Sequence, residues 1–238
     1  MLDRARALPG EERPAAVDAV KWRAALPEDA WPRGFPLDGV VWRRDVFAVA
    51  ERWRAGRAGA RELLAATLMW LHAANPHGRR RALRTLGGDP SGARLETVLA
   101  AVRTEHPGAA DLRASYVDFR RDCRLPLFEP DFATRLIYFA GYRRGAGGIQ
   151  PLILDDAIAA RLPEVAGITS PASRGSALEW IRYLAWAAER AAADGVEPDR
   201  VEMDLAAHGG RYGRAERDAG TPRRDRGPAP ARGRHAKR

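Results

Sequence analysis

The sequence predicts an all-α fold, and three observations support this prediction. Apolar residues recur at spacings of three and four through much of the chain, which is typical of amphipathic helices. No segment shows a sustained alternation of apolar and polar residues, the pattern expected of a half-buried strand. Segments that contain proline or glycine separate the helical stretches, at 87–92, 143–150 and 169–173.

The individual helices follow from these patterns in chain order. Within 43–53, residues such as Val49 and Trp53 belong to one apolar stripe. The next stretch, 60–74, is apolar almost all round and predicts a central buried helix. It ends before Pro76, because the residue preceding a proline is pushed out of the α region. Further helices are expected at 93–103, 109–123, 131–141, 156–162, 174–193 and 198–207.

The chain divides into three parts. We expect residues 1–34 to be a partly ordered N-terminal segment and residues 35–208 to form one helical domain. From 209 to 238 there is no apolar cluster, and ten Arg or Lys stand against three acidic residues, a net charge of +7. Such a segment cannot offset its ordering entropy by burial, so we predict a disordered basic tail. The tail is either simply solvated or adds a non-specific attraction to phosphates.

Charge and cysteine content narrow the classes of function. The chain carries +9, but residues 1–208 carry only +2, so net charge alone is weak support for nucleic-acid binding. The single cysteine, Cys123, excludes a disulfide framework and a cysteine-based metal cluster within this chain, and we expect no metal and no cofactor. No signal-peptide pattern or membrane-length apolar stretch occurs. We therefore expect a cytoplasmic monomer without a membrane partner.

One part of the sequence combines a buried helix with an aspartate. Residues 132–141 read FATRLIYFAG, and their two adjacent apolar stripes predict a mostly buried helix. Two prolines just before it predict a tight connection, so that 109–142 forms a helix, a turn and a second helix. After a glycine-rich loop, the segment 151–162 begins PLILD, and Asp155 is a candidate N-cap for a short helix.

These residues resemble the helix-hairpin-helix DNA glycosylases, and more closely the bacterial proteins described as having an 8-oxoguanine DNA glycosylase fold. In that family a Thr-Lys pair opens the helix after the hairpin, and an aspartate follows about twenty residues later. Here the pair reads Thr134-Arg135, and Asp155 follows Arg135 by 20 residues. The resemblance covers roughly 35–208 and is strongest in 125–165.

Two features depart from the family's pattern. The hairpin glycines, which let backbone N–H groups approach a DNA phosphate, correspond to Asp131 and Ala133. The lysine that attacks the sugar in bifunctional members corresponds to Arg135, whose guanidinium stays protonated and is a poor nucleophile. The two lysines of the chain, Lys21 and Lys237, lie outside the motif. The resemblance therefore implies a protein that lacks the Schiff-base step.

The resemblance implies that Asp155 is the catalytic residue. Cleavage of an N-glycosidic bond develops positive charge on the sugar, and a nearby carboxylate stabilises that charge while it orients or deprotonates a water. Arg135, in the position of the nucleophile, would contact the phosphate or base of an extruded nucleotide. The plainer interpretations are that Asp155 is only an N-cap and that Arg135 is a solvated charge or a salt-bridge partner. Asp156 is a competing candidate for either role of Asp155, that of the catalytic residue or that of the N-cap.

Further residues are candidates for contacts with DNA. Thr134 belongs to the same motif, and Arg80 and Arg84 share one face of a helix, although a solvated face is the commoner outcome. Four aromatic residues are candidates for stacking on an extruded base, with core packing as the plainer alternative: Trp70, Tyr138, Trp180 and Tyr183.

The sequence thus predicts a DNA base-excision N-glycosylase that acts on a modified base in double-stranded DNA at the bacterial nucleoid. We expect it to be monofunctional, with hydrolysis assisted by Asp155 and without AP-lyase activity. Oxidised guanine is suggested by the name of the fold alone, and a modified base of foreign DNA is equally open. The alternative is a catalytically inactive DNA-binding or protein-interaction module on the same fold.

Overall fold

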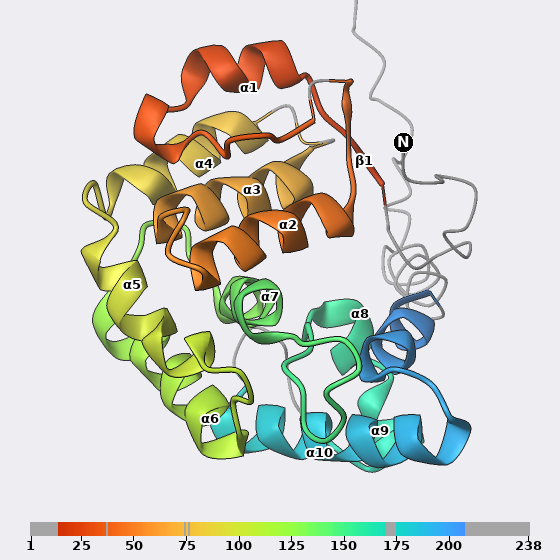
Figure 1. Cartoon of the computed structure of the whole chain (residues 1–238). Coiled ribbons are helices and arrows are strands. Elements are labelled where there is room, and N and C mark those ends of the chain that lie inside the picture. Colours follow the sequence, from red (N-terminus) through yellow and green to blue (C-terminus); the bar gives the residue numbers. More distant parts are fainter. Residues whose placement is uncertain (1–13, 37, 74, 76, 170–174, 208–238) are drawn as a thin grey trace, which may run out of the picture.

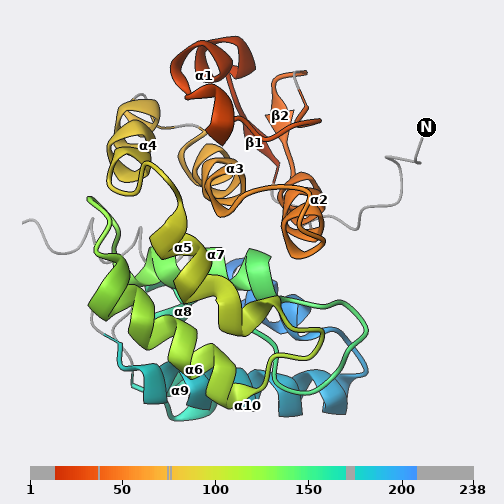
Figure 2. The ribbon, with the colours of Figure 1, turned by 60° about the vertical axis from the view of Figure 1, so that its left-hand side comes forward.

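The helices of the protein form two layers, as the computed structural model shows (Figures 1 and 2). The first layer contains α1 to α4 and a two-stranded sheet, and the second contains α5 to α10 and the last helix. The prediction of an all-α fold is confirmed, since the sheet pairs only two residues on each side. The structure describes residues 14–36, 38–73, 75, 77–169 and 175–207.

The first layer begins with elements that the sequence did not reveal. Strand β1 pairs antiparallel with β2, and α1 lies between them in the chain. The seven-residue α1 is too short to show a helical period, and it is fixed instead by the buried Trp22 and by Asp18, whose side chain caps it. The elements of this layer are β1 (Ala15–Ala16), α1 (Ala19–Ala25), η2 (Glu28–Ala30), β2 (Val40–Val41), α2 (Arg43–Arg54), α3 (Ala60–His72) and α4 (Gly78–Gly87).

The second layer follows the predicted helices with local changes. The helix expected at 93–103 ends in a 3₁₀ turn, the one at 109–123 ends in a π-helical turn, and the one at 156–162 is two short helices. Its elements are α5 (Ala93–Leu99), η3 (Ala100–Arg103), α6 (Ala109–Asp118), η4 (Phe119–Cys123), α7 (Pro130–Gly141), α8 (Asp156–Ala159), α9 (Leu162–Ala166), α10 (Ala177–Asp194) and a last helix at 198–207.

Helix α7 lies at the centre of the molecule (Figure 1). It packs against α2, α3 and α6, so it contacts both layers. Its residues from Leu136 to Ala140 have no exposed surface, as its two apolar stripes predict. The almost entirely apolar α3 is buried on all sides, also as predicted. A helix enclosed in this way gives the residues at its two ends a fixed position.

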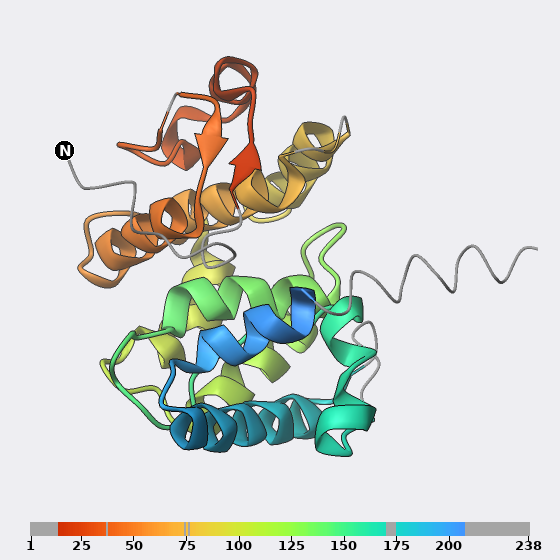
Figure 3. The same cartoon turned by 90° about the vertical axis from the view of Figure 1, so that its right-hand side faces the viewer.

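A buried ion pair joins the last helix to α2. The guanidinium of Arg43 donates to both carboxylate oxygens of Glu202, at 3.0 and 3.3 Å, and to the hydroxyl of Tyr138 on α7 at 3.0 Å. The two charged side chains are at most 2 % exposed. Figure 3 shows the last helix alongside α7, beneath α2. One guanidinium therefore connects three segments that are far apart in the sequence.

Two further properties concern the chain as a whole. Every helix in the described ranges is too short or too polar to span a bilayer. The basic tail expected at 209–238 lies outside the described residues, and so does most of the loop expected at 169–173.

Replacement of Glu202 by Gln should lower the free energy of unfolding by about 3–5 kcal/mol, because Arg43 then keeps a buried charge without a counter-charge. Chemical denaturation measures the change. The matched control is Asp194→Asn, which removes the same charge from the exposed Arg190–Asp194 pair and should have a much smaller effect. The double variant Arg43→Met/Glu202→Leu should recover much of the loss. Equal effects of Glu202→Gln and Asp194→Asn would contradict this account.

Candidate functional site

The connection before α7 is a tight turn. Arg124 and Leu127 have φ angles of 35° and 60°, in the left-handed region that favours glycine. Asp131 and Ala133, which the resemblance puts at the glycine positions of the hairpin, lie inside α7, in agreement with the helix expected at 131–141. The left-handed backbone of this turn is thus formed by two residues with side chains.

Thr134 joins α7 to the segment that ends in Asp155. Its hydroxyl donates to the carbonyl oxygen of Asp131 at 2.8 Å and accepts from the backbone N–H of Leu154 at 3.1 Å. The residue is only 1 % exposed. This burial corrects the expectation that Thr134 contacts DNA: its side chain is part of the interior. Its effect on the site is indirect, because it positions the backbone next to Asp155.

Arg135 lies between two carboxylates. Its Nη2 atom is 3.2 Å from Oδ2 of Asp155, and its Nη1 atom is 2.5 Å from Oδ2 of Asp131, one turn earlier on α7. The side chains of Arg135 and Asp155 retain 11 % and 19 % of their exposed surface. The two residues that the sequence singled out are therefore in direct contact and accessible from one side.

Asp155 is also the N-cap of α8. Its Oδ1 atom accepts from the backbone N–H of Ile158 at 3.1 Å, while its Oδ2 atom accepts from Arg135. An N–H group at a helix start and a guanidinium thus hold the two carboxylate oxygens in one orientation. The neighbouring Asp156 is exposed and forms no ion pair with a described residue. The structure thus distinguishes the two aspartates that the sequence left in competition.

His72, at the end of α3, is a neighbour of the site that the sequence did not indicate. Burial lowers the pKa of His72, and the charges of Arg81 and Arg135 lower it further. The first residue of α4, Gly78, passes so close that a Cβ there would lie 2.6 Å from the carbonyl oxygen of His72. A single histidine at the end of an apolar helix forms no sequence pattern that indicates a functional site. The close approach of α4 to His72 is visible only in the structure.

Helix α4 carries an exposed group of arginines. Arg80, Arg81 and Arg84 are exposed, and none of them forms an ion pair with any described residue. The charges of Arg81 and Arg135 both lower the pKa of His72, which links this basic face to Arg135 electrostatically. The expected pair Arg80 and Arg84 belongs to this face.

The four aromatic candidates for a base pocket are core residues. Trp180, Tyr183 and Tyr138 have no exposed surface, and Trp70 is 8 % exposed. The indole of Trp180 donates to the carbonyl oxygen of Leu152 at 3.0 Å and so supports the segment before Asp155. This corrects the prediction for Trp180, Tyr183 and Tyr138, because a ring without exposed surface cannot stack on a base in this arrangement.

Tyr183 nevertheless has an unusual environment. Its hydroxyl is buried and has no hydrogen-bond partner among the described residues. Burial raises the pKa of Tyr183, and the negative charges of Glu202 and Asp155 raise it further. The phenol therefore remains protonated in the interior between the buried ion pair and the candidate catalytic carboxylate.

Two other kinds of chemistry, at a thiol and at a metal ion, find no support among the described residues. Cys123 is buried, and burial raises the pKa of its thiol to about 12, so the sulfur is not a ready nucleophile. No group of three or more His, Cys, Asp or Glu side chains in the described ranges is arranged to hold a metal ion. The chemically distinctive group is the partly exposed carboxylate of Asp155 with its guanidinium partner.

The structure thus holds an aspartate beside the central helix, 20 residues after a partly exposed arginine with which it pairs. The family model described as "Putative 8-oxoguanine DNA glycosylase OGG-like protein" matches residues 10–205. The chain belongs to this family. The match includes β1 and α1, which precede the domain expected at 35–208. No curated protein and no solved structure matches the chain.

Replacement of Thr134 by Val should lower the free energy of unfolding by about 1–3 kcal/mol, because the buried N–H of Leu154 loses its acceptor. Chemical denaturation measures this loss. Thr134→Ser is the matched control: it keeps the hydroxyl and should retain most of the stability. If the Val and Ser variants were equally stable, the hydroxyl would not be what holds this segment to α7.

Proposed function

We propose that the protein is a monofunctional DNA N-glycosylase that hydrolyses the bond between a modified base and its deoxyribose in duplex DNA. The contact of 3.2 Å between Arg135 and Asp155 is the observation that supports this proposal. In this contact a partly exposed carboxylate lies beside the guanidinium of a residue in the first half of the central helix. Family membership supports the reaction class.

In this mechanism Asp155 acts on the sugar of the extruded nucleotide. As the N-glycosidic bond breaks, the base leaves with the bonding electrons and C1′ becomes positively charged. The carboxylate stabilises this charge, and it accepts a proton from the water whose oxygen forms the new bond to C1′. The departing base takes up this proton through solvent, so the base is released neutral and the carboxylate is restored. The products are the free base and an abasic site, and the strand remains intact.

Arg135 excludes the lyase step that bifunctional glycosylases carry out. Its guanidinium cannot form a Schiff base with the sugar, so no lyase step follows hydrolysis. Because Arg135 is held by Asp131 and Asp155, it orients the catalytic carboxylate, and it offers its remaining donors to a phosphate of the extruded nucleotide.

The exposed arginines of α4 provide the contact with the duplex. Arg80, Arg81 and Arg84 are exposed and form no ion pair with a described residue, so their guanidiniums are available to DNA phosphates. A single copy of the chain contains all of these groups, so we propose that it acts as a monomer.

One observation favours the alternative, a DNA-binding or interaction module without catalysis. Both carboxylate oxygens of Asp155 already accept a hydrogen bond, from Ile158 and from Arg135. In an inactive protein these bonds would be the entire role of Asp155, as a cap and an ion-pair partner. Each oxygen of a carboxylate has a second lone pair, so the same bonds also permit catalysis.

The activity is tested on duplexes that each carry one modified base, including 8-oxoguanine, hypoxanthine, uracil and alkylated or hydroxymethylated bases. We expect breaks at one class of base, and only after hot alkali, because the enzyme leaves an abasic site. Asp155→Asn should reduce base release at least 100-fold while it preserves the helix cap, since Asn also caps well.

Asp156→Asn is the matched control, since it makes the same change at the adjacent exposed position and should leave activity intact. Strand breaks without alkali, or trapping of the protein on DNA by borohydride, would contradict the monofunctional mechanism. DNA binding without release of any base on the panel would instead identify the inactive module.

Arg81→Gln and Arg84→Gln should each weaken binding to duplex DNA irrespective of sequence. Each should also reduce the slope of log K against log salt by about 0.9, because each removes one phosphate contact. Arg182→Gln, an exposed arginine on α10 in the other layer, is the control and should leave both unchanged. Titrations with fluorescent duplex at several salt concentrations measure both quantities. An equal effect of all three variants would show that only total charge matters.

A further inference from the structure

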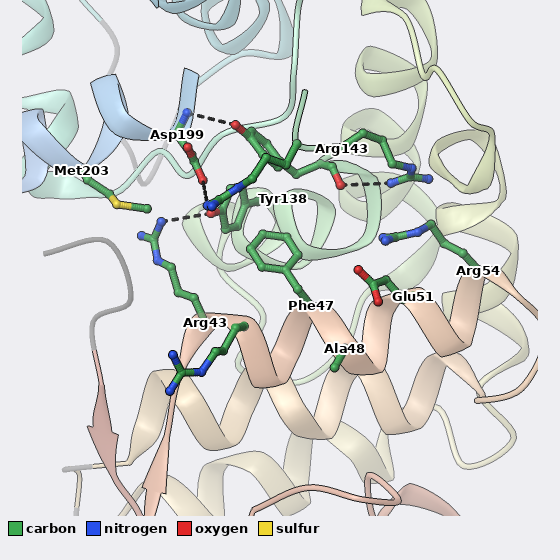
Figure 4. A pocket seen from close by; sticks show the side chains of 12 residues that line it. Arg43, Phe47, Ala48, Glu51, Arg54, Tyr138, Arg143, Asp199 and Met203 are labelled. Carbon is green, nitrogen blue, oxygen red and sulfur yellow. Dashed lines mark hydrogen bonds and ion pairs between the residues drawn. The ribbon is translucent and has the colours of Figure 1, made fainter. Parts of the chain in front are cut away.

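A pocket of about 430 Å³ lies between α2, the end of α7 and the last helix (Figure 4). Arg135 and Asp155 do not line it. The pocket lies at the end of α7, and this helix ends at Gly141, six residues or about 9 Å along its axis beyond Arg135. The pocket is lined by Arg43, Arg44, Phe47, Ala48, Glu51, Arg54, Tyr138, Tyr142, Arg143, Arg144, Asp199 and Met203.

The lining carries more positive than negative charge. It contains five arginines and two carboxylates, those of Glu51 and Asp199. Arg43 is neutralised by Glu202, and Arg144 pairs with Asp199 at 3.4 Å. Arg54 and Arg143 form no ion pair with a carboxylate among the described residues; their hydrogen bonds go to backbone carbonyl groups.

These two guanidiniums lie at the same end of the pocket, where Figure 4 shows their side chains reaching toward each other. Both donate to the carbonyl oxygen of Ala140, at 3.0 Å from Arg54 and 3.1 Å from Arg143. Burial and the charge of Arg54 lower the pKa of Arg143 to about 10, and burial lowers the pKa of Arg54. Two like charges are thus held together in a half-buried position.

Capping of helix ends accounts for only part of this arrangement. Arg54 and Arg143 donate to carbonyls at the end of α7, and Arg143 also donates to those of Val102, Arg103 and Thr104 at the end of η3. The carbonyl groups at a helix end carry about half a negative charge, so two guanidiniums bring more positive charge than two helix ends balance. Glu51 on the pocket wall and Glu105 offset part of the remainder. An anion in the pocket would relieve the repulsion that is left between Arg54 and Arg143.

We propose that this pocket binds a phosphate group between Arg54 and Arg143. A phosphate offers several acceptor oxygens to the planar donor arrays of two guanidiniums. The backbone carbonyls hold both side chains in place before the ligand arrives, so little side-chain entropy is lost on binding. Phe47, on the pocket wall, gives an apolar surface for the rest of the ligand. The phosphate belongs either to a free nucleotide or to the backbone of DNA.

The test uses the full chain and isothermal titration with AMP, with adenosine as the probe that lacks phosphate. Arg54→Gln and Arg143→Gln remove the charge but keep an N–H donor for the carbonyl groups. We expect wild type to bind AMP and not adenosine, and each variant to bind AMP at least tenfold more weakly. Arg52→Gln is the matched control, because Arg52 lies on the same helix outside the pocket, and it should bind as wild type does.

Titrations of the same proteins with an undamaged duplex distinguish the two sources of phosphate. If the ligand is a DNA phosphate, both variants lose affinity for the duplex and AMP competes with it; if it is a free nucleotide, only AMP binding falls. Equal AMP and DNA affinities in wild type and all three variants would overturn the proposal, because any binding would then come from other basic segments.

A thermal measurement on the wild-type protein tests the proposal without relying on a variant's folding. AMP should raise Tm with increasing concentration, while adenosine should not, because a ligand that binds only the folded state stabilises it by mass action. An equal response to AMP and adenosine, or no response to AMP at millimolar concentration, would contradict a phosphate site.

Discussion

The structure depends on the burial of one charged side chain, that of Arg43. Its guanidinium joins α2 to Glu202 on the last helix and to Tyr138 on α7. A buried guanidinium is tolerated only where its charge is matched and its donors are used, so the last helix must take one position relative to the two layers. Among the described residues the Nε atom of Arg43 has no hydrogen-bond partner, an unfavourable contribution that the other contacts of the cluster offset. Arg43 and Tyr138 of this cluster also line the pocket.

The two ends of helix α7 lie in chemically different surroundings. Near its start, Thr134 fixes the backbone of Leu154, and this places Asp155 within contact of Arg135. At its end, backbone carbonyls gather Arg54 and Arg143. Two carboxylates pair with the guanidinium near the first end, whereas the hydrogen bonds of Arg54 and Arg143 within the described part of the chain go to carbonyl groups. The first end is therefore suited to act on a sugar that develops positive charge, and the second to hold an anion.

The arginines of this chain have different roles, and a count of charges does not distinguish them. Arg43 holds the fold together, Arg135 orients a carboxylate, and Arg54 and Arg143 donate to the carbonyl groups at the end of α7. Arg80, Arg81 and Arg84 on α4 are exposed and form no ion pair with a described residue. Net charge alone supports DNA binding weakly, because the chemical role of each arginine depends on which acceptors surround it.

The sequence by itself determined the helical class, the burial of α3 and α7, and the pairing of Arg135 with Asp155 as residues of interest, because periodicity and short motifs are local properties of the chain. The tertiary structure decided everything that depends on contacts between distant segments. In the structure Thr134 holds the backbone of Leu154 inside the protein, and Trp180 and Tyr183 lie in the core. The left-handed residues of the turn before α7 are Arg124 and Leu127. The tertiary structure also brought α4 close to His72 and Arg54 to the end of α7. Burial and hydrogen-bond partners come from packing, so a pattern of residue types along one segment does not contain them.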